Sequence, residues 1–152
     1  MSAAMATFDE ARAYFLCGVC ETAQLATFQT RVTARPAMNV LDIGMPFEVT
    51  DDPETRGYLK LREHQAGTPI RILEAWNCGA CGSAQWAWLV VEDHRLSDVE
   101  RRDLTRETLA DTHYGTIQLY YLLPVGSGGE LDELPLNDKI DRLLQAAAQE
   151  AQ

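Results

Sequence analysis

The chain has 152 residues, of which 46% are apolar and 24% are charged, a size and composition typical of one globular domain. Its net charge of −10 argues against a large phosphate-binding face, because nucleic acid repels such a chain at long range. No apolar run reaches the ~18–20 residues that cross a bilayer, and the first residues lack the pattern of a signal peptide. We therefore expect a single domain over residues 1–152, no membrane partner and a cytoplasmic location.

The first predicted element is a β-hairpin over residues 11–33, with arms over 11–16 and 22–32. Residues 39–49 then alternate between apolar and other side chains, which predicts a longer strand. One side of that strand is expected to carry Leu41, Ile43, Met45, Phe47 and Val49. Pro46 lies inside this run and indicates an edge strand or a bulge, because proline cannot donate to a strand ladder.

The composition of residues 50–54 predicts an acidic turn, which is followed by a short strand over 58–61 and a loop over 64–69. Residues 70–76 and 84–92 are rich in β-branched and aromatic side chains, which favours a second hairpin.

A mid-chain helix is expected next, because Ser97-Asp98-Val99-Glu100 matches a capping box. This helix is predicted to end near Ala110. The largely apolar residues 116–123 predict a buried strand, and the glycine-rich residues 124–129 predict a loop.

The last segment is predicted to be a helix over about 137–151, with Asn137 as its N-cap. A narrow apolar stripe repeats there with helical spacing and consists of Ile140, Leu143, Leu144, Ala147 and Ala151. We expect this stripe to dock on the chain's own sheet, and docking on another subunit is the alternative.

Two short segments repeat each other at an offset of 61 residues: CGVCETAQLATF at 17–28 and CGACGSAQWAWL at 78–89. Each contains a Cys-x-x-Cys motif, and together they hold all four cysteines of the chain. Two matched pairs with none left over indicate one four-thiolate metal site. Its predicted ligands are Cys17, Cys20, Cys78 and Cys81.

The residue after the second cysteine of such a turn often adopts a left-handed conformation, which favours glycine. Gly82 satisfies this preference and Glu21 does not, so the first turn is expected to differ or to be strained. Zinc is the preferred metal, iron is a less favoured alternative for the same four thiolates, and a redox-active dithiol is the third interpretation.

Residues 17–32 and 76–92, about a fifth of the chain, resemble the two arms of the zinc-ribbon and rubredoxin-like group. The resemblance implies that both pairs of cysteines bind one metal ion. The chain departs from common ribbons in Glu21, in the absence of a proline after the first cysteine, and in a long insertion between the two metal-binding turns, or knuckles. Because zinc ribbons serve many roles, the resemblance is nearly silent on function.

Three tryptophans, Trp76, Trp86 and Trp88, lie around the second knuckle. Packing beside the metal site is the preferred interpretation. Trp86 and Trp88 share one face of a strand and would form a partner-binding surface if that face is exposed. The basic cluster expected near them, on one helix, consists of Arg101, Arg102 and Arg106. The three histidines and the acidic residues near Asp51 are interpreted as surface or hydrogen-bonded groups.

The predicted fold is α+β: a β-rich zinc-ribbon-like domain with a long insertion between the knuckles, one mid-chain helix and a C-terminal helix. A closed four-cysteine site leaves no position for a reactive water, so we expect a protein without catalytic activity. Its expected role is that of a structural or adaptor protein that binds other proteins, or its own copies, in a larger assembly such as a phage or viral virion. The alternatives are a nucleic-acid-associated zinc-ribbon module and a thiol redox protein.

Overall fold

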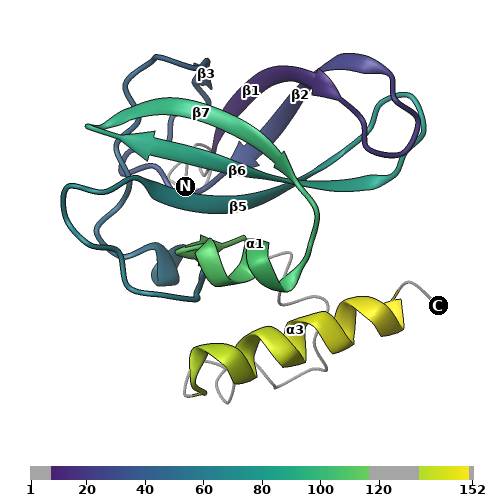
Figure 1. Ribbon diagram of the computed structural model, residues 1–152. Helices are drawn as coiled ribbons and strands as arrows, with labels where there is room; N and C mark the ends of the chain where they lie inside the picture. Colours follow the sequence, from purple (N-terminus) through teal and green to yellow (C-terminus); the bar gives the residue numbers. More distant parts are fainter. Residues whose placement is uncertain (1–7, 117–133, 151–152) are drawn as a thin grey trace, which may run out of the picture.

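The computed structural model describes residues 8–116 and 134–150 of the chain (Figure 1). Its elements, in chain order, are β1 (Asp9–Leu16), β2 (Ala23–Thr30), β3 (Val40–Leu41), the 3-10 helix η2 (Pro53–Arg56), β4 (Leu59–Lys60), β5 (Ile70–Asn77), β6 (Ala84–Glu92), β7 (Arg95–Arg102), α1 (Arg106–Asp111), β8 (Tyr114–Gly115) and α3 (Leu136–Glu150). The α+β class with a mid-chain and a C-terminal helix is thereby confirmed. No helix in the described ranges is both long and apolar enough to span a bilayer.

The strands form two sheets, with order β2-β1-β3 in the first and β4-β8-β5-β6-β7 in the second. Figure 1 shows the β1–β2 hairpin on one side of the second sheet, and α1 and α3 on the other side. Both predicted hairpins are confirmed, as is the short strand near residue 59.

The two hairpins are structural copies of each other over their whole length. In β1–β2 the antiparallel register runs from Asp9↔Thr30 to Leu16↔Ala23, and in β5–β6 the equivalent pairs run from Ile70↔Val91 to Asn77↔Ala84. Every position in the second hairpin lies 61 residues after its counterpart in the first. Each hairpin also pairs its first strand in parallel with a short third strand, β3 or β8. The internal repeat therefore extends well beyond the two knuckles visible in the sequence.

The main hydrophobic core lies between the inner faces of the two hairpins. Strand alternation places equivalent residues there, for example Ala11 and Ile72, or Phe28 and Leu89, and all four are fully buried. Aromatic rings join the two halves, since Trp76 packs edge-on against Phe15 and Phe28 with ring centroids 5.1 and 6.1 Å apart.

A second core covers the outer face of the β5–β6 hairpin. Its sheet residues include Leu73, Trp88 and Val90, and its helix residues include Leu109 of α1 and Ile140 and Leu143 of α3. The predicted stripe of the C-terminal helix is buried within the chain itself: α3 packs chiefly on α1 and shares this core with residues of the second sheet. Ala146 is buried in the same stripe, Leu144 and Ala147 are half-buried, and Ala151 lies outside the described residues.

The long strand predicted over 39–49 is wrong, because only Val40–Leu41 are paired as a strand. Gly44 has a φ of +97° inside a turn in which the N–H of Met45 donates to the carbonyl of Asp42 at 3.1 Å. Ile43 and Met45 are consequently exposed, whereas Leu41 and Phe47 reach the core from opposite ends of the turn.

The helix start predicted at Ser97 is also wrong, because β7 runs through these residues. Asp93 and His94 form a tight turn with positive φ after β6, and Ser97 Oγ then donates to the carbonyl of Val90 across the sheet at 3.0 Å. The helix begins instead after Thr105, whose side chain accepts from the N–H of Thr108. The strand predicted over 116–123 and the loop over 124–129 fall almost wholly outside the described residues.

Candidate metal centre

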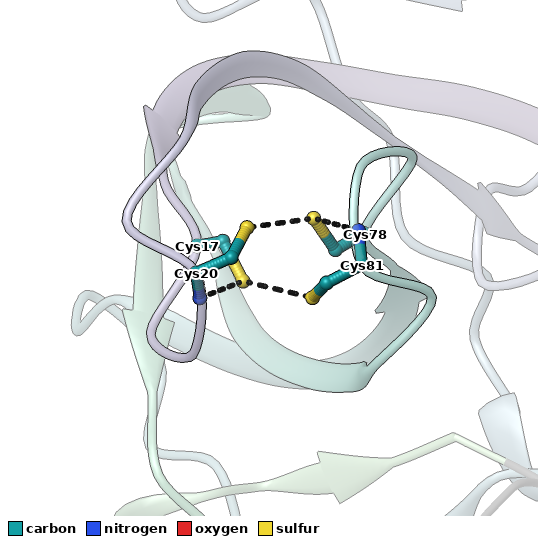
Figure 2. Close-up of side chains that lie close together, drawn as sticks. All are labelled: Cys17, Cys20, Cys78 and Cys81. Atoms are coloured by element: carbon teal, nitrogen blue, oxygen red, sulfur yellow. Dashed lines mark hydrogen bonds between the residues drawn. The ribbon is translucent and has the colours of Figure 1, made fainter.

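The four cysteines meet where the two hairpin turns face each other (Figure 2). The sulfur of Cys17 lies 3.7 Å from that of Cys81, and the sulfur of Cys20 lies 3.7 Å from that of Cys78. All four sulfur atoms lie within 4.8 Å of one another, and all four cysteines are free thiols. A tetrahedral ion with bonds of about 2.3 Å needs sulfur atoms about 3.8 Å apart, so the cluster has the dimensions of a four-thiolate metal site.

Each knuckle is closed by the same backbone hydrogen bond. The N–H of Glu21 donates to the carbonyl of Cys17 at 3.1 Å, and the N–H of Gly82 donates to the carbonyl of Cys78 at 2.8 Å. Both closing residues have positive φ, +58° at Glu21 and +75° at Gly82. The left-handed position predicted from the sequence is confirmed, and the first knuckle adopts it with a residue that disfavours it.

Backbone amides point at the first sulfur of each pair. Their N–H groups belong to Val19 and Cys20 around Cys17, at 3.3 and 3.4 Å, and to Ala80 and Cys81 around Cys78, at 3.4 and 3.5 Å. Donors of this kind stabilise a thiolate. The Cys20 N–H, helped by that of Val19, lowers the pKa of Cys17 to about 6, and the Cys81 N–H is the largest contribution that lowers the pKa of Cys78.

Two glutamines cross from one hairpin to the other. The N–H of Gly79 donates to Gln24 Oε1 at 3.0 Å, and reciprocally the N–H of Gly18 donates to Gln85 Oε1 at 3.2 Å. Gln24 Nε2 also donates to Cys78 Sγ at 3.0 Å. This exchange is the pattern of a two-fold axis, in which residue i contacts j and j contacts i. The two knuckles are therefore related by a local pseudo-twofold axis.

The second cysteine of each pair contacts a hydroxyl group two residues later. Cys20 Sγ lies 3.3 Å from Thr22 Oγ1, and Cys81 Sγ lies 3.0 Å from Ser83 Oγ. Ser83 is in turn held by Gln85 Nε2 at 2.7 Å. Gln24 and Gln85 occupy equivalent positions of the sequence repeat. Their role in joining the two knuckles becomes apparent only in the structure, where the two turns face each other.

Arg101 packs against the first knuckle. A Cβ atom added to Gly18 would lie 2.5 Å from Arg101 Nη1, so a larger residue there would require the guanidinium to move. A four-thiolate site around a divalent ion carries a net charge of −2, and the positive charge of Arg101 beside it favours the bound state. Arg101 also pairs with Asp103 at 3.4 Å.

The tryptophans lie on both faces of the second sheet. Trp76 is in the core between the sheets, whereas Trp86 and Trp88 share the helix-covered face as predicted. Trp88 is only 5% exposed and its Nε1 donates to Thr112 Oγ1 at 2.8 Å, so the exposed face that a partner site requires is absent at Trp88. Trp86 is half-buried at the edge of the same cluster, and a partner-binding role there stays a prediction.

The three arginines do not lie on one helix, which corrects the sequence-based expectation. Arg101 and Arg102 are consecutive residues at the end of β7 and point to opposite faces, while Arg106 begins α1. Arg102 stacks on the ring of Trp88 at 4.4 Å, and Arg106 forms an ion pair with Asp141 of α3. Their separation arises because β7 continues through the segment predicted as helix.

A buried carboxylate was missed by the sequence analysis. Glu74 lies between the two sheets, at the position equivalent to Ala13, and accepts a hydrogen bond from the hydroxyl of Tyr58, which is also 3.1 Å from Thr30 Oγ1. Burial raises the pKa of Glu74 to about 7, although the Tyr58 hydrogen bond opposes the shift. Strand alternation places Glu74 on the same inward face as Trp76, so the sequence pattern did contain a signal that this carboxylate is buried.

The histidines are surface or hydrogen-bonded groups, as expected. His113 Nδ1 accepts from the N–H of Arg71 at 3.0 Å, and burial lowers its pKa to about 4. His64 is exposed and packs edge-on against the His113 ring. Asp51 and its acidic neighbours are exposed around the short helix η2.

Comparisons of the chain with models of protein families, with curated proteins and with solved structures find no match. The metal centre therefore rests on its own geometry: four converging sulfurs, amide donors to two of them and a reciprocal pair of glutamines.

Proposed function

We propose that the four cysteines hold one structural zinc ion, and that the protein is a non-catalytic adaptor of the zinc-ribbon type that works by binding other proteins. The observation that supports this proposal most directly is that all four sulfur atoms converge to the spacing of a tetrahedral site. Four thiolates complete the coordination of zinc and leave no position for a reactive water, so a site of this kind holds structure rather than activating a substrate. Iron is the second metal that four thiolates accept.

The site joins parts of the chain that are far apart in sequence. Cys20 and Cys78 are separated by 57 residues, and a cross-link that closes so long a loop removes much conformational entropy from the unfolded chain. Metal binding then contributes directly to folding. The role proposed for the ion is to hold the two hairpins face to face.

Matched substitutions test this role. Cys17→Ser and Cys78→Ser remove the buried ligand of the first and the second knuckle, respectively. Both variants are expected to lose the zinc and the cooperative thermal transition, as measured by elemental analysis and circular dichroism. Ser83→Ala is the control, because it changes the same turn without removing a ligand. A Cys78→Ser protein that keeps its metal content and its transition contradicts the structural site.

Support for an adaptor role comes from the distribution of exposed apolar side chains. All large ones found on the surface of the described residues lie between positions 14 and 45, on the first sheet and its loops. Tyr14 is 80% exposed and lies directly across from Leu25 on the outer face of the β1–β2 hairpin, with Leu16 and Val19 nearby in the chain. Exposed apolar groups gathered on one face are typical of protein-binding surfaces.

Affinity purification tests the adaptor role. Native protein and a Tyr14→Ser/Leu25→Thr variant are purified from the same source, and the proteins that co-purify are compared. We expect a partner, or a second copy of the chain, that is retained by the native protein and lost from the variant, while the zinc content of both stays the same. Equal retention by both excludes the Tyr14 face, and recovery of the monomer alone contradicts the adaptor role.

A further inference from the structure

A pocket of about 570 Å³ lies at the end of the β5–β6 hairpin opposite the cysteines. Its walls come from residues 47–53, 63–70 and 91–94, with Tyr114 between them. Ile70 and Val91 form the last pair of the hairpin, seven residue pairs from the knuckle, which is about 23 Å at 3.3 Å per residue. The volume is within the range of small-molecule sites, roughly 300–1,000 Å³.

The floor of this pocket is apolar and aromatic. Ile70, Val91 and Phe47 are buried below it, and the ring of Tyr114 is half-buried beside them. Apolar and aromatic side chains of this kind offer a surface on which the apolar part of a small ligand packs.

The charged groups that line the pocket are carboxylates, and two histidines, His64 and His94, lie among them. Four carboxylates line the pocket, those of Asp51, Glu63, Glu92 and Asp93, and the lining contains no lysine or arginine. Glu63 pairs with Lys60 at 2.6 Å, while the other three have no ion-pair partner among the described residues. Burial is the largest cause that raises the pKa of the Tyr114 hydroxyl. The positive charge of Lys60 opposes the shift, and the carboxylates of Glu54, Glu63 and Asp52 add to it.

These carboxylates do not converge on one point. Within the described ranges, the four cysteines are the group that brings three or more metal-ligating atoms together, and no residue of the pocket belongs to it. A divalent ion requires several converging oxygen ligands at about 2.0–2.6 Å, whereas an organic ammonium ion does not, so the pocket is better suited to an organic ammonium ion.

The equivalent end of the first hairpin is filled. Asp9, the counterpart of Ile70, is 2% exposed and accepts from Thr33 Oγ1 at 2.7 Å and from the N–H groups of Ala37 and Asn39 at 2.9 Å. These bonds hold the loop over residues 33–39 against β1. Ile70 has no side-chain acceptor of this kind, and residues of the segment before it, 63–69, line the pocket.

We propose that this pocket binds a small organic cation, whose ammonium group faces the carboxylates of Asp51, Glu92 and Asp93 and whose apolar body lies on Ile70, Val91 and Tyr114. The site is separate from the metal centre and does not depend on the adaptor role.

The experiment titrates zinc-loaded, isotope-labelled protein with 2-phenylethylammonium and follows the backbone amides by NMR. Two ligands of similar size serve as probes of charge: neutral 2-phenylethanol and anionic 3-phenylpropanoate. We expect saturable shifts in residues 63–70 and 91–94, binding of the alcohol weaker by about fivefold, which is the size of one partly exposed ion pair, and no binding of the anion.

Charge-only variants locate the site. Glu92→Gln/Asp93→Asn and, in a different segment, Asp51→Asn are expected to weaken binding of the amine several-fold. Glu100→Gln/Glu107→Gln has the same change in net charge away from the pocket and is expected to bind like the native protein. Thermal unfolding confirms that each variant is folded. The proposal is overturned if the amine gives no saturable shift at millimolar concentrations, if the three ligands bind equally, or if both pocket variants bind like the native protein.

Discussion

The β1–β2 and β5–β6 hairpins share their register and a Cys-x-x-Cys turn, but the side chains on their outer faces differ. On the second hairpin, Leu73, Trp88 and Val90 face outwards and are buried beneath α1 and α3. On the first hairpin, the same three positions are occupied by Arg12, Thr27 and Gln29, which face solvent or lie half-exposed.

The features that the hairpins share are those that a four-thiolate site requires. The features in which they differ depend on what packs against each hairpin. The knuckles are alike down to the positive φ of Glu21 and Gly82, and the tetrahedral coordination that we propose would require this one backbone geometry of both. The outer faces follow their neighbours: the face below the helices is apolar, and the bare face is mixed, with Tyr14 and Leu25 exposed. The partner binding that we propose is therefore expected on the half that the chain leaves uncovered.

The largest expected contrast comes from the same substitution on the two faces. Leu143→Ala removes a fully buried side chain beneath the second sheet and is expected to lower the free energy of unfolding by about 3 kcal/mol. Leu25→Ala on the bare face, where the side chain is 38% exposed, is expected to cost less than about 1 kcal/mol. Urea denaturation of the zinc-loaded proteins measures both, and equal costs would remove the distinction between covered and bare faces.

The inner faces differ at one position, Ala13 in the first hairpin and Glu74 in the second. Because the folded-state pKa of Glu74 is raised from 4.5 to about 7, the folded state binds the extra proton, and stability is lost as the pH rises from 4.5 through 7. The loss is on the order of 3 kcal/mol. Glu74→Gln keeps an acceptor for Tyr58 without the charge, so its stability relative to the native protein is expected to rise over this interval.

Comparison with the variant at each pH also removes the contribution of metal release, which both proteins share. A constant difference in stability between pH 4.5 and 8 contradicts the raised pKa.

A smaller contrast concerns the hydrogen bond under the helices. Thr112→Val leaves the buried Trp88 Nε1 without its acceptor and is expected to cost about 1–2 kcal/mol. Thr27→Val, at the position equivalent to Trp88 on the bare face, is expected to change stability by less than about 0.5 kcal/mol. Thermal unfolding of the two variants side by side measures the difference, and a neutral Thr112→Val would show that the bond contributes little.

The smallest effect is expected within the knuckles. Glu21→Gly relieves a left-handed residue and should stabilise the protein by up to about 1 kcal/mol, whereas Gly82→Glu should destabilise it by a similar amount. No atom lies within 4 Å of the Cβ position at Gly82, so a Cβ atom there meets no steric clash, and its cost is conformational. Changes of the same sign at the two positions would show that the knuckles are not equivalent.

The metal centre and both hairpins could be predicted from the sequence because their determinants are local. Two cysteines three positions apart fit one hairpin turn, and the flanking β-formers continue into the arms. The crossed contacts of Gln24 and Gln85 could not be predicted, since they depend on how two distant turns face each other.

The two wrong elements show how tertiary structure overrides a local pattern. Ser97 and Glu100 match a capping box, yet Leu96 and Val99 are buried in the sheet and β7 pairs with β6 through Arg102. The alternation over 39–49 is interrupted at Gly44, where the backbone turns with positive φ so that Phe47 reaches the core. In both cases, burial of the apolar residues in the core selects a backbone conformation that the short-range sequence pattern does not predict.

The central claim is that one metal ion, held by Cys17, Cys20, Cys78 and Cys81, joins two equivalent hairpins. The most direct test is the metal content of the purified chain, together with its thermal unfolding before and after treatment with a strong chelator. We predict about one zinc ion per chain and loss of the cooperative transition when it is removed. A chain that carries no metal and unfolds with the same transition in the presence and absence of chelator would contradict this account.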